Sequence, residues 1–239
     1  MIKLIRLDKF LKDMGIGTRK EVKEYIRKKL VKVNNIVIKN DDLKIDEDKD
    51  IVTFNNEIIK YEKFIYLMLN KPAGVVSATF DNKDKTVIDL INEYKHLNLF
   101  PFGRLDKDSE GLLIISNDGK LAHELLSPKK HVDKKYYVDV EGKVSEEDVK
   151  RFKEGIVLDD NESCKSSTLE IIESNAISKC YVTISEGKYH QVKRMFESVN
   201  KKVIYLKRIT FGNLSLDNNL KLGEYRKLTE DEIDLLRKK

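Results

Sequence analysis

The sequence predicts an α+β protein in which a small basic domain precedes a larger domain built on a largely antiparallel mixed sheet. Short strands and helices alternate without a regular β-α-β order, and the charge changes sign once, early in the chain. The pattern changes near Tyr61, so we expect domains at residues 1–60 and 62–239. A chain of 239 residues can bury a core without disulfide bonds.

The composition argues against a secreted, membrane or metal-binding protein. Cys164 and Cys180 form no C-x-x-C pair, and no histidine lies at zinc-ligand spacing, so we expect free thiols and no metal. The first turn is charged, and no apolar run approaches the length of a membrane span. We therefore expect a cytoplasmic protein without a signal peptide.

Residues 7–14 begin the N-terminal domain with apolar side chains at helical spacing. Thr18 can cap a second helix, whose apolar stripe is Val22, Ile26 and Leu30. The next segment, VKVNNIVIK, alternates apolar and polar residues around two asparagines, which is typical of a β-hairpin. These patterns predict two helices on a small hairpin sheet.

The N-terminal domain carries an uneven charge. Residues 1–32 contain eleven basic and four acidic side chains, a net charge of +7, whereas residues 33–60 have a net charge of −3. A concentrated basic surface favours a polyanionic partner. The basic side chains that we expect to bind this polyanion are Lys9, Arg19, Lys20, Lys23 and Arg27.

The larger domain is expected to contain several strands and helices. Strands are expected at residues 64–70, 75–79, 112–116, 134–142, 167–173, 180–187 and 201–212. Helices are expected at residues 118–126, 145–155, 189–200 and 229–238. Ser145 and Asp148 stand in capping positions of the second of these helices, and Thr229 and Glu232 form a capping box on the last.

The segment GRLDKDSEGLLIISNDG, residues 103–119, places a dense group of charges before an apolar strand. It is not a calcium loop, because Glu110 is too long for its position and Asn117 stands where a bidentate glutamate is required. No phosphate-binding loop, G-x-S-x-G or H-E-x-x-H motif is present. These residues alone also fit a solvated turn.

Three segments in order resemble the motifs of pseudouridine synthases: GRLDKDSEGLL, KKYYV and EGKYHQVKRMF. The resemblance is closest to the Rsu family, which modifies small-subunit (16S) ribosomal RNA. The segment RLDKFLKDMGIGTRKEVKEYIRKKLVKVNNIVI resembles the S4 RNA-binding domain. Together these resemblances extend over essentially the whole chain.

The resemblance implies an enzyme that cuts the glycosidic bond of a uridine in RNA, turns the base and rejoins it through carbon 5. Such an isomerisation needs no cofactor and no metal. It does need the target base taken out of its stack. The implied partner is ribosomal RNA or a ribosomal assembly intermediate, bound by a monomer.

The resemblance also implies an active site. Asp106 matches the catalytic aspartate, as nucleophile or as base. Lys193 matches its basic partner, with Arg194 as the alternative. Tyr136 matches the aromatic residue that stacks on the uracil, and Tyr137 is then expected to face the core.

Further residues are expected to contact RNA. Arg104 matches an arginine associated with displacing the base or holding a phosphate, and His190 is equally well explained as a structural histidine. The remaining RNA-binding candidates are Lys188, Gln191 and Arg194. Two alternatives stay open: a synthase acting on 23S ribosomal RNA, and a non-enzymatic RNA-binding or ribosome-assembly protein.

Overall fold

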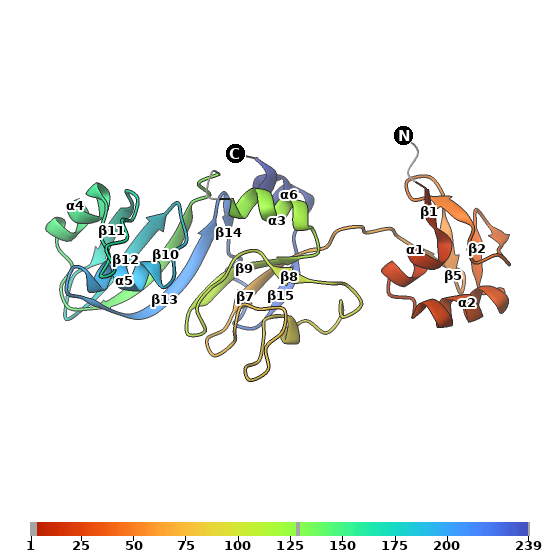
Figure 1. Cartoon of the computed structure of the whole chain (residues 1–239), viewed down its shortest axis with the longest axis horizontal. Helices are drawn as coiled ribbons and strands as arrows, with labels where there is room; N and C mark the ends of the chain where they lie inside the picture. Colours follow the sequence, from red (N-terminus) through yellow and green to blue (C-terminus); the bar gives the residue numbers. More distant parts are fainter. Residues whose placement is uncertain (1–3, 128–129, 239) are drawn as a thin grey trace. The chain divides into compact units, whose positions relative to one another are not determined.

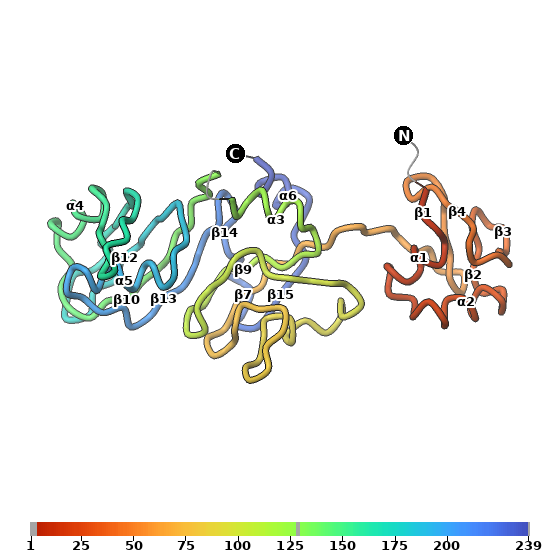
Figure 2. Tube along the Cα trace, viewed as in Figure 1, coloured from red at the N-terminus to blue at the C-terminus, as the bar shows by residue number. Residues whose placement is uncertain are grey.

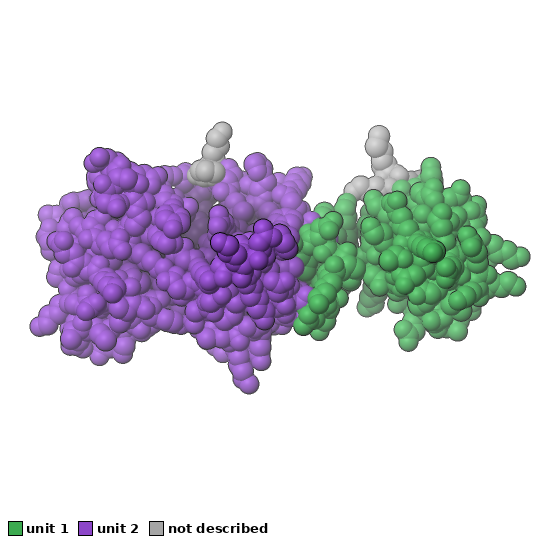
Figure 3. Space-filling model, turned by 60° about the horizontal axis from the view of Figure 1, so that its bottom comes forward, with its two compact units in different colours: residues 1–65, 92–99 green, residues 66–91, 100–239 purple. Residues whose placement is uncertain are grey.

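The computed structural model describes residues 4–127 and 130–238. The chain divides into two compact units, Met1–Ile65 with Asn92–Leu99, and Tyr66–Ile91 with Phe100–Lys239 (Figure 3). The first unit therefore includes a short segment from the middle of the chain in addition to its N-terminal part. The predicted α+β class is confirmed, because both units combine helices with sheets.

The first unit packs two helices against short strands. In α2 (Arg19–Arg27) the Thr18 side chain accepts a hydrogen bond from the Glu21 N–H, and the Glu21 carboxylate accepts one from the Thr18 N–H. The other elements are α1 (Leu7–Asp13), β1 (Leu4–Arg6), β2 (Val31–Val33), β3 (Ile36–Val37), β4 (Lys44–Asp46), β5 (Val52–Phe54) and β6 (Glu57–Ile59). The expected hairpin is β2–β3.

The second unit is organised around one sheet that, over the described residues, has nine strands (Figures 1 and 2). Its order is β11-β12-β10-β13-β9-β7-β15, with β8 beside β9 and β14 beside β13. The strands are β7 (Tyr66–Lys71), β8 (Phe100–Pro101), β9 (Glu110–Ser116), β10 (Lys134–Glu141), β11 (Thr168–Glu173), β12 (Ile177–Ile184), β13 (Lys202–Phe211), β14 (Leu214–Ser215) and β15 (Tyr225–Lys227).

Helices cover the sheet in two groups. Helix α3 (Gly119–Leu126) and helix α6 (Glu230–Arg237) bury apolar side chains with those of β7 and β9. Helix α4 (Glu146–Glu154) contacts β11, and α5 (Gln191–Glu197) contacts β13. The two meet through the rings of Phe152 and Phe196, 5.0 Å apart. A short 3-10 helix is formed by Ile88–Leu90.

The strand expected at residues 75–79 is not formed. Val76 makes a single isolated bridge to Thr86. Ser77 instead uses its side chain to accept a hydrogen bond from the Leu105 N–H and to donate one to the Leu105 carbonyl, at 3.0 and 2.8 Å. The segment is fixed by loop contacts that the alternation of residue types does not reveal.

Strands β13 and β9 join the two halves of the sheet, and they pair in parallel over only two positions. Gly111 lies opposite Arg208, has a φ of +102°, and would place a Cβ atom 2.2 Å from the Arg208 carbonyl oxygen. No other residue type fits so close an approach. The Arg208 Nε also donates to the Leu112 carbonyl at 2.7 Å, a side-chain hydrogen bond that stabilises the same β13–β9 joint.

Asp148 is a buried carboxylate on which α4 depends. It accepts hydrogen bonds from the N–H and Oγ of Ser145 at 2.8 and 2.9 Å and pairs with Lys201 at 3.0 Å. Burial alone raises its pKa, but the Ser145 hydrogen bond and the Lys201 charge outweigh burial and lower the pKa of Asp148 below its ordinary 3.8. The helix cap therefore requires the ionised carboxylate.

We expect Asp148→Asn to lower the free energy of unfolding by about 2 kcal/mol at pH 7, because a cap and a buried ion pair are both lost. A carboxylate whose pKa is lower in the folded state stabilises the fold above about pH 4, and that stabilisation declines as the pH falls through the folded-state pKa. Urea titrations from pH 7 to pH 3 should therefore show the two proteins converging. Exposed Glu147→Gln in the same helical turn is the control, and an equal loss there would contradict the prediction.

Candidate active site

One buried amine binds the backbone of the loop that carries Asp106. The Lys71 Nζ donates to the carbonyl oxygens of Pro72, Asp106, Lys107 and Ser109 at 3.0, 3.0, 3.3 and 2.8 Å. Lys71 is fully buried, and burial lowers the pKa of its amine to about 8, which leaves it charged at pH 7. One ammonium group therefore fixes the backbone from the aspartate to Ser109.

Further contacts fix the same loop at its surface. The Gly74 N–H donates to the Lys107 carbonyl at 2.7 Å, and the Lys107 side chain donates to Asp84 at 2.6 Å.

The sequence analysis did not identify Lys71 as a residue of the site. The signal that could have found it is a lysine closing the apolar strand YLMLNK, in which every residue is buried.

Lys193 from α5 lies beside Asp106. Its Nζ is 3.2 Å from the Asp106 carboxylate and 2.6 Å from that of Asp108. The side chains of Lys193 and Asp106 are 18% and 25% exposed, so the pair is partly shielded from water. Burial alone lowers the pKa of a lysine, but the Asp108 hydrogen bond and the Asp106 charge outweigh burial and raise that of Lys193. The amine is a permanent cation here.

His190 also approaches the aspartate, with Nε2 3.6 Å from the Asp106 Oδ1. It precedes α5 in a left-handed conformation, φ 48° and ψ 31°. Gln191 is buried, accepting from the Lys188 N–H at 2.9 Å and donating to Glu186 at 2.8 Å. Its amide shapes the loop before the helix, and a contact of Gln191 with RNA stays a prediction.

Arg194 does not lie against Asp106 as the alternative cation. Its guanidinium is 2.7 Å from Asp159 and 2.6 Å from Asp160. Adjacent side chains of a helix point in different directions, so these two neighbours on α5 serve different carboxylates. Between the two basic candidates, the geometry favours Lys193.

Tyr136 lies on β10, in register with Arg208 of β13, and is 7% exposed. Burial lowers the pKa of the Arg208 guanidinium, which lies beside Tyr136, and the Arg208 Nη2 has no partner within residues 4–127 and 130–238. The expectation that Tyr137 faces the core is wrong, because Tyr137 is half-buried on the other face and donates to Asp139 at 2.7 Å. The strand alternation is correct, but the buried face is that of Tyr136.

The remaining candidate RNA contacts are mostly at the surface. Arg104 is exposed on the loop before Asp106. In the first unit Lys23 pairs with Asp41 at 3.0 Å and is half-buried. The exposed candidates of that unit are Lys9, Arg19, Lys20 and Arg27.

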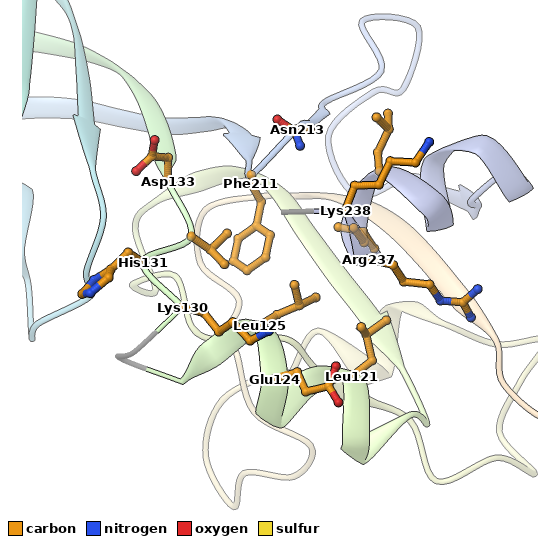
Figure 4. Close-up of a pocket in the computed structure, with 14 residues that line it drawn as sticks. Leu121, Glu124, Leu125, Lys130, His131, Asp133, Phe211, Asn213, Arg237 and Lys238 are labelled. Carbon is orange, nitrogen blue, oxygen red and sulfur yellow. The ribbon is translucent and has the colours of Figure 1, made fainter.

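A pocket of about 380 Å³ lies elsewhere, between α3, α6 and the end of β13 (Figure 4). Its lining mixes apolar side chains such as Leu121 and Phe211 with the basic Lys130 and Arg237. None of the catalytic candidates lines it. The candidate active site is therefore the Asp106–Lys193 pair and not this pocket.

Other kinds of site are not evident in the part of the chain that the structure describes. There, no group of three or more His, Cys, Asp or Glu side chains could hold a metal ion, and no helix is long and apolar enough to cross a membrane. Cys164 and Cys180 are both free and buried.

An aspartate paired with a lysine, in a chain that begins with a basic helical unit, fits an enzyme that acts on RNA, and the comparisons with known proteins give the family. Two family models match the chain: the S4 domain over residues 5–51 and RNA pseudouridylate synthase over residues 65–198. The chain belongs to the RNA pseudouridylate synthase family and is an enzyme that acts on RNA.

Relatives match over almost the whole chain. An uncharacterized RNA pseudouridine synthase, YtzG of Bacillus subtilis, is 46% identical over 97% of this chain and 98% of its own. Ribosomal small subunit pseudouridine synthase A of Escherichia coli is 36% identical over 96% and 98%. A crystal structure of a pseudouridylate synthase has a TM-score of 0.69 at 37% identity, covering 97% and 99% of the two chains.

Replacing Lys71 with methionine should disorder the Asp106 loop. Each of the carbonyls that lose the amine is left unsatisfied at about 1–3 kcal/mol, so we expect the free energy of unfolding to fall by roughly 3 kcal/mol. Turnover of uridine in RNA should fall with it. Exposed Lys120→Met is the control. Equal urea midpoints for the two variants would show that the amine does not hold the loop.

Proposed function

We propose that this enzyme converts one uridine of small-subunit (16S) ribosomal RNA to pseudouridine, with Asp106 as its catalytic carboxylate. The observation that carries the proposal is the 3.2 Å contact between Asp106 and the Lys193 amine. A fixed cation at this distance attracts the carboxylate and holds it in position. Relatives named for the small ribosomal subunit support the choice of substrate.

The reactant and the product of this reaction are isomers. The bond from the ribose C1′ to the uracil N1 breaks, the base turns, C1′ bonds to C5, and the C5 proton is replaced by a proton at N1. Asp106 acts on the sugar as nucleophile or as base, and both roles need the ionised form. No cofactor is required for this isomerisation.

Tyr136 is the aromatic partner in this proposal. Extruding a base costs a few kcal/mol, and stacking on an aromatic ring returns about 1–3 kcal/mol. Arg208 lies opposite Tyr136 in the register of β10 and β13 and is itself fixed by its hydrogen bond to the Leu112 carbonyl, so the ring has a rigid neighbour. Tyr136 then holds the flipped uracil beside the carboxylate.

The S4 domain supplies affinity and register. Its exposed basic side chains lie on α1 and α2, where they can bind phosphates without reading sequence. We place this RNA-docking function in residues 1–60 and catalysis in residues 62–239, in a monomer of the cytoplasm. The substrate is ribosomal RNA or a ribosomal assembly intermediate.

Two basic RNA-binding candidates form ion pairs with an acidic loop, residues 159–162. Arg194 contacts Asp159 and Asp160, and Lys188 lies 2.7 Å from Glu162. The two aspartates are well exposed, so these pairs are weak and easily exchanged for phosphates. The loop therefore competes with RNA for the same cations.

Replacing Asp159 and Asp160 together with asparagine should tighten RNA binding, because Arg194 no longer has to give up its carboxylates. We expect the dissociation constant to fall about fivefold at 50 mM salt, with a steeper salt dependence. Filter binding of small-subunit RNA measures both. Glu146→Gln with Glu147→Gln removes the same charge from exposed positions of α4. An equal effect there would assign the change to net charge alone.

The proposed activity is tested by mapping pseudouridine with carbodiimide and primer extension in small- and large-subunit ribosomal RNA. We expect one new stop in the small-subunit RNA, absent when Asp106→Asn replaces the native protein, because asparagine cannot act as a carboxylate. A stop in large-subunit RNA would assign the 23S substrate instead. Tight binding without a stop in either RNA, or in assembly intermediates, would favour a non-enzymatic RNA-binding protein.

A further inference from the structure

Tyr189 presents a bare aromatic ring next to the candidate active site. It is 77% exposed, more than any other large hydrophobic side chain among the described residues. Its ring stacks on that of His190, with centroids 3.9 Å apart and planes within 16°. The Nε2 of His190 lies 3.6 Å from the Asp106 carboxylate. One exposed ring is thus connected to the catalytic candidate through a single residue.

The backbone holds this stack in place. His190 has φ 48° and ψ 31°, a left-handed conformation that is uncommon for residues other than glycine. Its conformation is fixed by Gln191, whose buried amide bonds to Lys188 and Glu186 on the other side of the turn. Uncommon backbone conformations of this kind are retained where the surroundings determine them, often at ligand sites.

The packing of Tyr189 does not by itself account for its position. One face of the ring lies on His190, and the side chain remains largely in water, so it contributes little burial to the fold. A phenol ring offers a flat apolar surface of the kind on which bases of single-stranded RNA stack. Lys188, the residue before Tyr189, supplies a cation for a flanking phosphate once it gives up its surface pair with Glu162.

We propose that the Tyr189–His190 stack is a platform for a second RNA base, the nucleotide next to the uridine that enters the active site. This inference rests on the proposed function for the identity of the target uridine. Tyr136 binds the flipped uracil, whereas Tyr189 holds an unpaired neighbour and so keeps the strand open around the target. The platform selects substrates whose target lies in an unpaired or easily opened segment.

Binding to the platform can be measured without catalysis. The chain has no tryptophan, so Tyr189→Trp introduces a single tryptophan whose fluorescence can be excited selectively in the presence of the tyrosines. Titration with decauridylate in 50 mM salt should quench its fluorescence, and an abasic ribose-phosphate decamer should not. Ile177→Trp is the control, because Ile177 begins β12 and lies about 20 Å along the strand from the end that leads to Tyr189. Equal quenching by the abasic chain, or no quenching by decauridylate, would overturn the platform.

The role in substrate choice is measured on an RNA fragment that contains the mapped uridine. Tyr189→Ala should raise the dissociation constant and KM about tenfold, with kcat changed less than threefold, whereas Tyr189→Phe should remain near the native values. An abasic nucleotide at the flanking position should weaken binding of the native protein and not weaken the alanine variant further. Equal losses in both proteins would show that the ring does not contact that base.

Failure of this inference and failure of the proposed function have different signatures. If the native protein forms no pseudouridine but the Tyr189→Trp variant shows base-dependent quenching, the platform is retained and the proposed reaction is lost. If the native protein forms pseudouridine and has the same KM as Tyr189→Ala, the reaction is retained and the platform is lost.

Discussion

The candidate active site depends on a short parallel joint in the central sheet. Asp106 belongs to the half that contains β7 and β9, whereas Tyr136 and Lys193 belong to the half that contains β10, β13 and α5. Only two residue pairs connect β13 to β9, and one of them requires Gly111, because a Cβ atom there would collide with the facing backbone. The otherwise antiparallel sheet is parallel where its two halves meet, and Asp106 of one half contacts Lys193 of the other.

Charge then stabilises the site at two levels. On the buried side of the loop, the ammonium of Lys71 donates hydrogen bonds to backbone carbonyls, which replace the water it has lost. On the side of the candidate site, Lys193 is paired with two carboxylates. These carboxylates stabilise its positive charge, and Asp106 has a cation beside it. An apolar side chain in place of Lys71 would leave backbone carbonyls unsatisfied, and one in place of Lys193 would leave Asp106 without its cation.

The edge of the site is arranged differently from its centre. Around Asp106 the ion pairs are partly shielded, whereas the acidic loop around Arg194 is open to solvent and its pairs exchange readily with other anions. The exposed Tyr189 stack stands at the same edge. A site centre shielded from water suits a reaction that needs a defined ionisation state. Solvent-exposed ion pairs at the edge, which can exchange their carboxylates for phosphates, suit a long polyanionic substrate.

Local sequence determined most of the elements. Alternation predicted β10, β12 and β13, helical spacing predicted α5, and capping boxes marked the starts of α4 and α6, because these signals arise from residues close in the chain. The resemblance to known motifs supplied the family and the candidate residues. Only the tertiary structure showed that Lys71 binds the Asp106 loop, that Arg194 faces an acidic loop, and that Tyr136 rather than Tyr137 is buried. These contacts join residues that are distant in the chain, and periodicity carries no information about which distant groups meet.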